Sequence, residues 1–162
     1  MNDLVTARLW LRPMGVDEAR NVALGVPGAH STWAPGYPAV SDIVAVGGFL
    51  EYRAVAGDPR PFGPYQLIRR ADGLTIGGGG FHGPPGEDGS VWIGYGVIPP
   101  ARRNGYATEA LRALLAFARE RGVAVVRGEA DRANDVSQRV MTAVGMVFVG
   151  EDHTRRHYAI TF

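Results

Sequence analysis

A basic turn followed by a helix carries the clearest chemical signal in the sequence. Arg102, Arg103, Asn104 and Gly105 stand between an apolar stretch that ends near Val97 and a stretch with helical periodicity. The first turn of a helix has backbone N–H groups without intrahelical partners, and the helix dipole makes this end electropositive. Guanidinium groups add charge there, and a glycine lets a ligand come close to the backbone. This combination predicts a site for a phosphate or pyrophosphate.

Two interpretations of this turn stay open at the level of sequence. One is an anion-binding turn, and the other is a solvated basic turn in which glycine serves only the chain reversal. The turn has no Gly-Lys-Ser/Thr, so it is not a Walker loop, and it lacks the G-x-G-x-x-G spacing of dinucleotide-binding turns. These two nucleotide-binding motifs are therefore excluded.

The segments on either side of the turn have regular secondary-structure patterns. Residues 90–98 have the composition of a strand that ends at Pro99-Pro100, and the helix after the turn ends at Gly122. Apolar residues recur in this helix with the spacing i, i+3, i+4, i+7, i+8 and i+11, at Ala107, Ala110, Leu111, Leu114, Leu115 and Ala118. This spacing predicts one core-facing stripe.

The rest of the chain also divides into strands and helices. Further strands are expected at residues 8–14, 65–70, 74–83, 123–130, 146–151 and 156–162, and further helices at 16–24, from caps at Ser41 and Asp42 onward, and at 134–145. Asp72-Gly73 predicts a hairpin turn, and the glycine run at 77–80 predicts a bulge or a close approach by another group. The order of elements predicts a mixed α+β sheet in a single domain spanning residues 1–162.

The composition limits the classes of function. The chain has 162 residues, of which 46% are hydrophobic and 20% charged, as in an ordinary globular domain. A net charge of +1 favours neither nucleic acid nor membrane as a partner. Cysteine and lysine are absent, which excludes disulfides, thiolate or lysine nucleophiles and cysteine-ligated metal. The N-terminus has no signal-peptide pattern, so a cytoplasmic protein is expected.

Spaced motifs in the second half of the chain resemble those of the GNAT N-acetyltransferases. Arg102, Gly105 and Ala107 form Arg-x-x-Gly-x-Ala after a strand and at the start of a helix, like the acyl-CoA-binding signature of that family. The likeness continues in GYATEALRALLAFA and GEADRANDVSQRVMTAVGM. GFHGPPGEDGSVWIGYGVIPP resembles the branch that includes the ribosomal-protein N-terminal acetyltransferases. The resemblance is dense from about Leu74 to Val149.

The resemblance implies a fold and a co-substrate. The fold would be GNAT-like, with a mostly antiparallel sheet of about six to seven strands, splayed at the cofactor strand, and about four helices. The co-substrate would be acetyl-CoA, with no metal. The pyrophosphate would lie on Arg102, Arg103, Asn104, Gly105, Tyr106, Ala107 and Thr108. The main chain of Tyr95, Gly96 and Val97 would bind the pantetheine arm and polarise the thioester carbonyl.

By the same resemblance, a second motif around Asn134 would supply a further cofactor contact and the proton donor. Asn134 would contact the cofactor arm or cap the helix that it precedes. Some relatives donate a proton to the CoA thiolate from a tyrosine, but Met141 occupies that position here. Ser137 has a hydroxyl that can serve instead, and its alternative role is also helix capping.

The proton acceptor is less clear, because the sequence departs from the family there. Related sequences often carry a glutamate before IGY that acts as the base, and Trp92 stands at that position here. Glu129 is the replacement candidate, with His82 and Glu87 behind it. The alternative for Glu129 is a strand-end carboxylate paired with arginine, and the alternative for His82 is a solvated hairpin residue.

Aromatic residues are the candidates for the acceptor site. Trp33, Tyr37, Tyr52 and Trp92 are expected around it, although such aromatics are often local pieces of core. The predicted function is transfer of an acetyl group to a primary amine, on a protein N-terminus or a small molecule. The alternative is an acyl-CoA-binding sensor or regulatory module, in which Trp92 reflects loss of the base. The number of chains that assemble is open, and a homodimer is compatible with the sequence.

Overall fold

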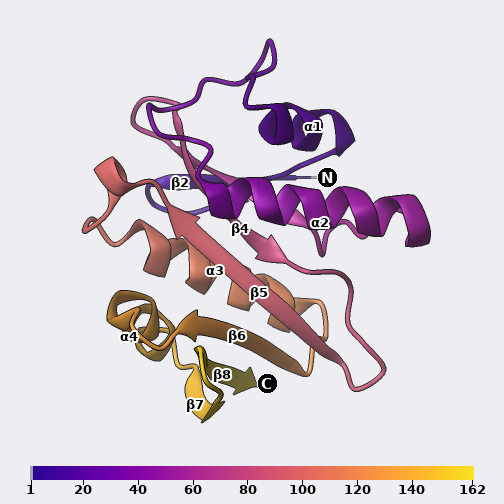
Figure 1. The fold of residues 1–162 in the computed structure, drawn as a ribbon, viewed down its shortest axis with the longest axis vertical. Helices are drawn as coiled ribbons and strands as arrows, with labels where there is room; N and C mark the ends of the chain where they lie inside the picture. The colour runs from indigo at the N-terminus through magenta and orange to yellow at the C-terminus, as the bar shows by residue number, and fades with distance from the viewer. Residues whose placement is uncertain (1) are drawn as a thin grey trace.

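The computed structural model describes residues 2–162, in which eight strands form one sheet (Figure 1). The strands are β1 (Leu4–Val5), β2 (Leu9–Pro13), β3 (Pro64–Arg69), β4 (Thr75–Phe81), β5 (Ser90–Val97), β6 (Val125–Asp131), β7 (Val147–Glu151) and β8 (Arg155–Thr161). The helices are α1 (Val16–Leu24), α2 (Val40–Ala56), α3 (Tyr106–Glu120) and α4 (Asp135–Ala143), with a short 3-10 turn at Pro99–Ala101. The strand order is β1-β2-β3-β4-β5-β6-β8-β7.

The fold class predicted from the sequence is confirmed. Every neighbouring pair in the sheet is antiparallel except β5 and β6, which are parallel. The seven strands expected from sequence patterns are present, and the eighth, β1, is a two-residue strand paired with β2. Two residues are too few to show a period of two, so no sequence pattern marks this strand.

Helices cover both faces of the sheet. The helices α1 and α2 pack together on one face, while α3 and α4 contact each other on the opposite face (Figure 1). The predicted stripe of α3 is confirmed, because Ala110, Leu111, Leu114 and Ala118 are fully buried against the sheet. Burying these apolar side chains fixes the rotation of α3 and therefore where its first turn lies.

The start of α2 differs from the sequence prediction. The helix begins at Val40 with Ala39 at its N-cap, so Ser41 and Asp42 lie in its first turn and not before it. Asp42 acts from the third helical position, where its Oδ2 accepts a hydrogen bond of 2.9 Å from the Ala39 N–H. A carboxylate can satisfy a free N–H from this position as well as from the cap, and the sequence does not distinguish the two.

The glycine run in β4 is explained by the close approach of the neighbouring strand β5 and of α2. A Cβ on Gly77 would overlap the carbonyl oxygen of Gly96, and a Cβ on Gly78 would overlap Oδ1 of Asp42. A register shift between β3 and β4 at Leu67 adds the predicted irregularity. Both sequence expectations for this run are therefore confirmed, and the approaching group on the α2 side is a carboxylate.

The strands β5 and β6 diverge after a short pairing. Their paired residues stop at Trp92 and Arg127, and Figure 1 shows the two strands separating toward the ends that lead into α3 and α4. Two backbone hydrogen bonds fix which residues of β5 face β4. They run from His82 N–H, just after β4, to Trp92 O and from Ile98 N–H to Ile76 O. Tyr95 must therefore turn its backbone N–H and C=O toward the gap, as must Val97.

Candidate active site

The first turn of α3 has free backbone donors. Gly105 is its N-cap, in a left-handed conformation with φ of 80°, and no side chain caps the helix. The first N–H bonded within the helix is that of Glu109, at 3.0 Å from Gly105 O. The amides of Tyr106, Ala107 and Thr108 therefore point out of the helix end without an intrahelical acceptor.

The turn before α3 has a backbone shaped for close contact. Arg103 has φ of 66°, the one non-glycine residue among those described with positive φ, and Gly105 is left-handed as well. Left-handed residues within one short turn can aim neighbouring backbone N–H groups into a concavity, which suits an anion. A left-handed arginine is uncommon, and such strain is concentrated at functional sites.

The side chains of the turn divide between bracing and binding. The Asn104 amide donates to Ala101 O and Arg102 O, both at 3.0 Å, so this residue holds the turn together. Arg102 donates from Nε to Val97 O at 2.9 Å, which ties the turn to the end of β5. Arg103 is exposed at the tip of the turn. The predicted residues thus lie together, and two of them also maintain the shape of the turn.

A third arginine reaches the same helix end from the N-terminal part of the chain. The guanidinium of Arg8 lies over the Tyr106 ring, 4.4 Å from its centroid, and pairs with Glu109 at 2.8 Å. Glu109 also accepts from the hydroxyl of Thr6. Sequence reasoning missed Arg8, because only the fold brings β2 beside the first turn of α3.

Tyr95 and Ser137 meet across the gap between β5 and α4. The Tyr95 hydroxyl lies 2.8 Å from Ser137 Oγ and 3.1 Å from Ser137 O. Burial raises the pKa of Tyr95, and the hydrogen bond with Ser137 opposes that shift. Asn134 is the cap of α4, with its Oδ1 accepting from Ser137 N–H at 3.1 Å. The sequence offered Asn134 and Ser137 as caps of this helix, and Asn134 is the residue that caps it. The Ser137 hydroxyl is therefore free to contact the Tyr95 hydroxyl.

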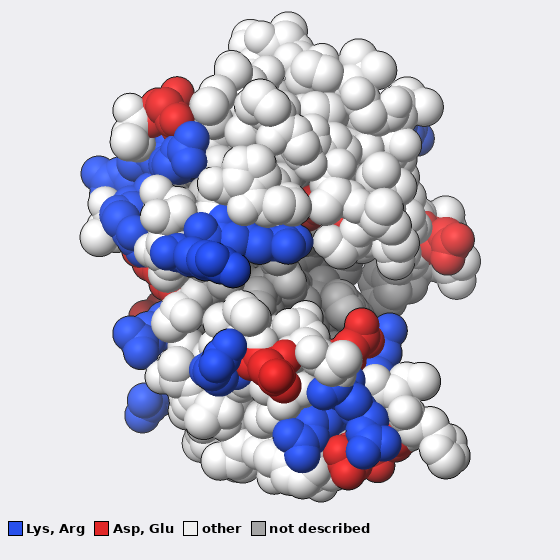
Figure 2. Space-filling model, turned by 60° about the vertical axis from the view of Figure 1, so that its left-hand side comes forward, with Lys and Arg blue, Asp and Glu red and all other residues white. Residues whose placement is uncertain are grey.

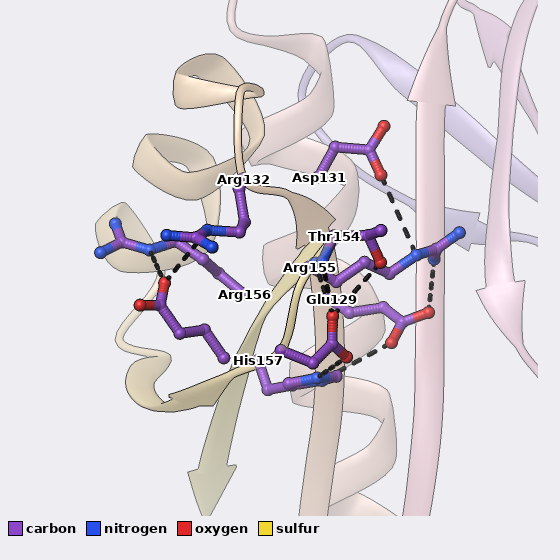
Figure 3. Close-up of polar contacts among 9 residues, drawn as sticks. Glu129, Asp131, Arg132, Thr154, Arg155, Arg156 and His157 are labelled. Carbon is purple, nitrogen blue, oxygen red and sulfur yellow. Dashed lines mark hydrogen bonds and ion pairs between the residues drawn. The ribbon is translucent and has the colours of Figure 1, made fainter.

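Glu129 belongs to an ion-pair network at the ends of β6 and β8 (Figure 3). Its carboxylate pairs with Arg155 and lies 3.6 Å from Nδ1 of His157, whose Nε2 is 3.0 Å from Asp152. Figure 3 shows the Glu129 carboxylate between Arg155 and His157. The pairing with arginine that was the alternative interpretation of Glu129 is therefore present.

His82 and Trp92 lie near Glu129 on the α2 face of the sheet. His82 directly follows β4, and its N–H donates to the carbonyl oxygen of Trp92 on β5. The imidazole lies close over Gly94, and partial burial lowers the pKa of His82, while the nearby Glu129 opposes this. Trp92 is 40% exposed and its ring meets His157 edge-on. His82 thus faces the position where relatives carry glutamate.

The aromatic residues expected around the acceptor separate into two places. Trp33 and Tyr37 contact each other edge to face before α2, where Tyr37 is buried and its hydroxyl accepts from Gln66. Burial raises the pKa of Tyr37. Tyr52 lies at the other end of α2, beside Gly83 and the Trp92 side of the sheet. The local-core interpretation therefore fits Tyr37, while Tyr52 and Trp92 are exposed.

The side of the molecule on which β5 and β6 diverge is hollowed. Figure 2 shows a depression across the middle of this face, with arginine atoms gathered along its upper margin and mixed charges below it. Above the depression much of the surface carries no charge.

Comparison with known proteins identifies the family. The chain matches the model described as acetyltransferase (GNAT) domain over residues 8–147. It is 25% identical over 111 residues to an uncharacterized N-acetyltransferase, YjdG, of Bacillus subtilis (strain 168). That match covers 68% of this chain and 66% of the relative, which is slightly less than two thirds of its length.

Solved structures share the fold along nearly the whole chain. A putative ribosomal-protein-serine acetyltransferase from Vibrio cholerae has a TM-score of 0.69 at 19% identity, covering 99% of both chains. The ribosomal L7/L12 alpha-N-protein acetyltransferase RimL, solved with coenzyme A, has a TM-score of 0.70 at 17% identity, covering 99% of this chain and 98% of that one.

These findings establish the class of protein. The chain belongs to the GNAT acetyltransferase family, as its motifs predicted, and is an acyltransferase of that family. Among residues 2–162 there is no cluster of three or more histidine and acidic side chains arranged to hold a metal ion. No helix in the described part of the chain combines the length and apolar character needed to span a membrane.

Proposed function

We propose that this protein transfers an acetyl group from acetyl-CoA to a primary amine. The observation that carries the proposal is the uncapped first turn of α3, placed beside a strand whose backbone polar groups face a gap. The free amides of Tyr106, Ala107 and Thr108 fit a pyrophosphate, with charge from Arg103 and Arg8. The relative solved with coenzyme A, which shares the fold, supports this use of the site.

The gap beside β5 fits the amide-rich arm of the cofactor. The N–H and C=O groups of Tyr95 and the N–H of Val97 turn away from β4 and pair with no strand, so they can bond an extended pantetheine as a missing strand would. The Val97 carbonyl already accepts from Arg102. An N–H of β5 would also polarise the thioester carbonyl. Bound acetyl-CoA supplies the activated acetyl group, and the chain contributes binding, orientation and proton transfer.

Ser137 and Tyr95 are proposed to protonate the leaving thiolate. Their hydroxyls are 2.8 Å apart, so either one can donate while the other supports it. Asn134 fixes Ser137 through the capping bond to its N–H, which holds the start of α4 at the gap. Glu129 remains a candidate for the base, and in this structure its carboxylate is paired with Arg155.

The acceptor is proposed to enter on the α2 face, past Trp92 and Tyr52, and Trp33 stays a candidate at the other end of α2. The structures that share the fold include acetyltransferases of ribosomal proteins, which supports a protein N-terminus as the acceptor, and a small-molecule amine fits the same chemistry. We also propose that the protein is cytoplasmic and that it forms a homodimer.

The test is release of free thiol. The protein is mixed with acetyl-CoA and a panel of peptides with free N-termini and small primary amines, and thiol is followed by a colorimetric reagent. We expect at least one amine to raise thiol release well above the rate without amine. Coenzyme A binding in a calorimeter with no turnover on any amine would instead favour the sensor module.

Two variants sharpen the assignment. Arg102→Ala combined with Gly105→Trp should weaken coenzyme A binding. The control is Arg12→Gln, which should not weaken it, because Arg12 is an exposed residue of β2 that pairs with Asp3. Unchanged affinity in the double variant would contradict the assignment of the α3 turn. Trp92→Glu tests the natural site, since a large gain in rate would mean that the native protein lacks an efficient base.

A further inference from the structure

A buried carboxylate lies on the acceptor face of the sheet and has no cationic partner. Asp42 is 8% exposed, and its Oδ2 accepts the Ala39 N–H. Its Oδ1 has no hydrogen-bond donor among the described residues, and no arginine or histidine forms an ion pair with it there. Burying a charge without a partner is costly, so an acid in this position needs a reason.

The sheet beneath Asp42 is built to accommodate the carboxylate. Oδ1 occupies the place that a side chain at Gly78 would fill, and Ser41 Oγ would lie 3.6 Å from a Cβ on Gly96. Because Gly78 pairs with Gly96, the first turn of α2 lies over both β4 and β5. The free oxygen therefore lies over β4, and the neighbouring Ser41 lies over the segment of β5 whose other edge faces the gap.

The charged surroundings of Asp42 lack any competing cation. Tyr37, on the loop before α2, feels the Asp42 charge, and Glu18 of α1 adds a second negative charge to the same environment. Beneath the carboxylate, β4 and β5 contribute the glycine backbone of Gly78 and Gly96. No positively charged side chain among the described residues acts on the Asp42 carboxylate, so its charge favours binding of a cation.

We propose that Asp42 binds the ammonium group of the acceptor and takes its proton. This inference rests on the acetyltransferase function proposed above and names the residue that replaces the glutamate missing at position 92. The ammonium gives one proton to the Asp42 carboxylate, and the free amine attacks the thioester carbonyl carbon. The C–N bond forms and the C–S bond breaks. The nitrogen then loses its second proton, and the leaving thiolate gains one proton and departs as free thiol.

The two proton transfers would then occur on opposite faces of the sheet. Asp42 lies on the α2 face, while Tyr95 packs beside Leu114 on the α3 face, where its hydroxyl meets Ser137. The amine would lose its proton to a residue on one face, and the thiolate would gain its proton from residues on the other face. The two transfers therefore need no shared residue. This arrangement suits direct transfer in a ternary complex.

The central variant is Asp42→Asn, which keeps the shape and an oxygen that can accept the Ala39 N–H. Using the amine that turns over fastest in the panel, we expect kcat to fall on the order of 10²-fold or more, with loss of the acidic limb of the pH profile. The Kd of coenzyme A, measured by calorimetry, should stay within about twofold. Asp17→Asn, in the exposed first turn of α1, is the matched control and should change neither quantity.

Several outcomes separate this inference from the proposed function. A wild-type enzyme that acetylates amines, with an Asp42→Asn variant of unchanged kcat and pH profile, would overturn the role of Asp42 alone. Loss of the acidic limb in His82→Asn or Glu129→Gln, but not in Asp42→Asn, would do the same and assign the base to that residue. Absence of both turnover and coenzyme A binding in the wild type would instead overturn the proposed function.

Discussion

At the scale of single residues, substitution of the two glycines at the ends of α3 can distinguish the effect of backbone strain from the effect on ligand binding. Gly105 and Gly122 are both left-handed, with φ of 80° and 78°, so alanine at either position should destabilise the fold by about 1 kcal/mol. Only Gly105 adjoins the free amides of the first turn.

We expect Gly105→Ala to lower coenzyme A affinity and Gly122→Ala to leave it unchanged. The added Cβ at position 105 lies 3.3 Å from a guanidinium nitrogen of Arg8 and crowds the approach to the backbone. Calorimetry gives the affinity, and urea denaturation gives the stability. Equal affinity in the two variants would mean that the ligand does not approach Gly105.

The buried carboxylate on α2 predicts a pH-dependent stability. Burial raises the pKa of Asp42 from 3.8 to about 6, so the folded protein holds this proton more tightly than the unfolded chain. The resulting stabilisation is complete below about pH 4 and is lost as the pH rises through about 6. The difference corresponds to roughly 3 kcal/mol at most.

Asp42→Asn should therefore be more stable than the wild type at pH 7 to 8, with the difference shrinking toward zero at pH 4. Urea denaturation of the two proteins across this range measures the difference directly, because other titrating groups cancel. A variant that is less stable at every pH would mean that the carboxylate serves as a structural cap. Greater stability with lower activity is the expected mark of a functional buried charge.

At the scale of elements, β5 is a strand with one edge paired and one edge free beyond Trp92. Its edge toward β4 is paired along five residue pairs, from Gly77 with Val97 to Phe81 with Ile93. Its other edge pairs with β6 at three residue pairs only. An unpaired edge inside a sheet is a place for an extended ligand to bind as a strand.

Amide hydrogen exchange should reveal this asymmetry. The amides of Tyr95 and Val97, which face the gap, should exchange rapidly in the free protein and slow by at least about tenfold with coenzyme A. The amides of Gly94 and Gly96, which face β4, should be protected in both states and serve as internal controls. Slowing at α4 alone, with no change in β5, would contradict binding in the gap.

At the scale of the whole molecule, the first few residues complete a site built by the second half of the chain. Arg8 pairs with Glu109, 101 residues away, and lies over the Tyr106 ring. Without Arg8, the Glu109 carboxylate would stand unpaired beside the amides that are proposed to receive the pyrophosphate. Like charges in this position repel.

We therefore expect Arg8→Gln to weaken coenzyme A binding by about 1 kcal/mol, or roughly fivefold, in low salt. Adding Glu109→Gln should restore part of the affinity, because it removes the unpaired carboxylate. Higher ionic strength should reduce the effect of Arg8→Gln. If Glu109→Gln restores nothing, Arg8 acts by direct contact with the ligand and not by neutralising Glu109.

The sequence alone determined the family, the order of the elements other than β1, and the turn that precedes α3. These features are local: the α3 stripe, the Asp72-Gly73 hairpin and the Arg-x-x-Gly-x-Ala turn depend on residues within a few positions of one another. Helical and strand periodicities, caps and left-handed glycines act over such distances, so they can be recognised in a linear pattern.

Tertiary structure decided which side chains meet. Glu129 was a plausible base by its place on a strand, but the register of β6 against β8 pairs it with Arg155. Asp42 looked like a helix cap, and only the packing of α2 on a glycine floor shows a carboxylate with a free oxygen over the sheet. Contacts between distant segments depend on strand register and helix packing, and these are set by the burial of the entire core rather than by any short stretch of sequence.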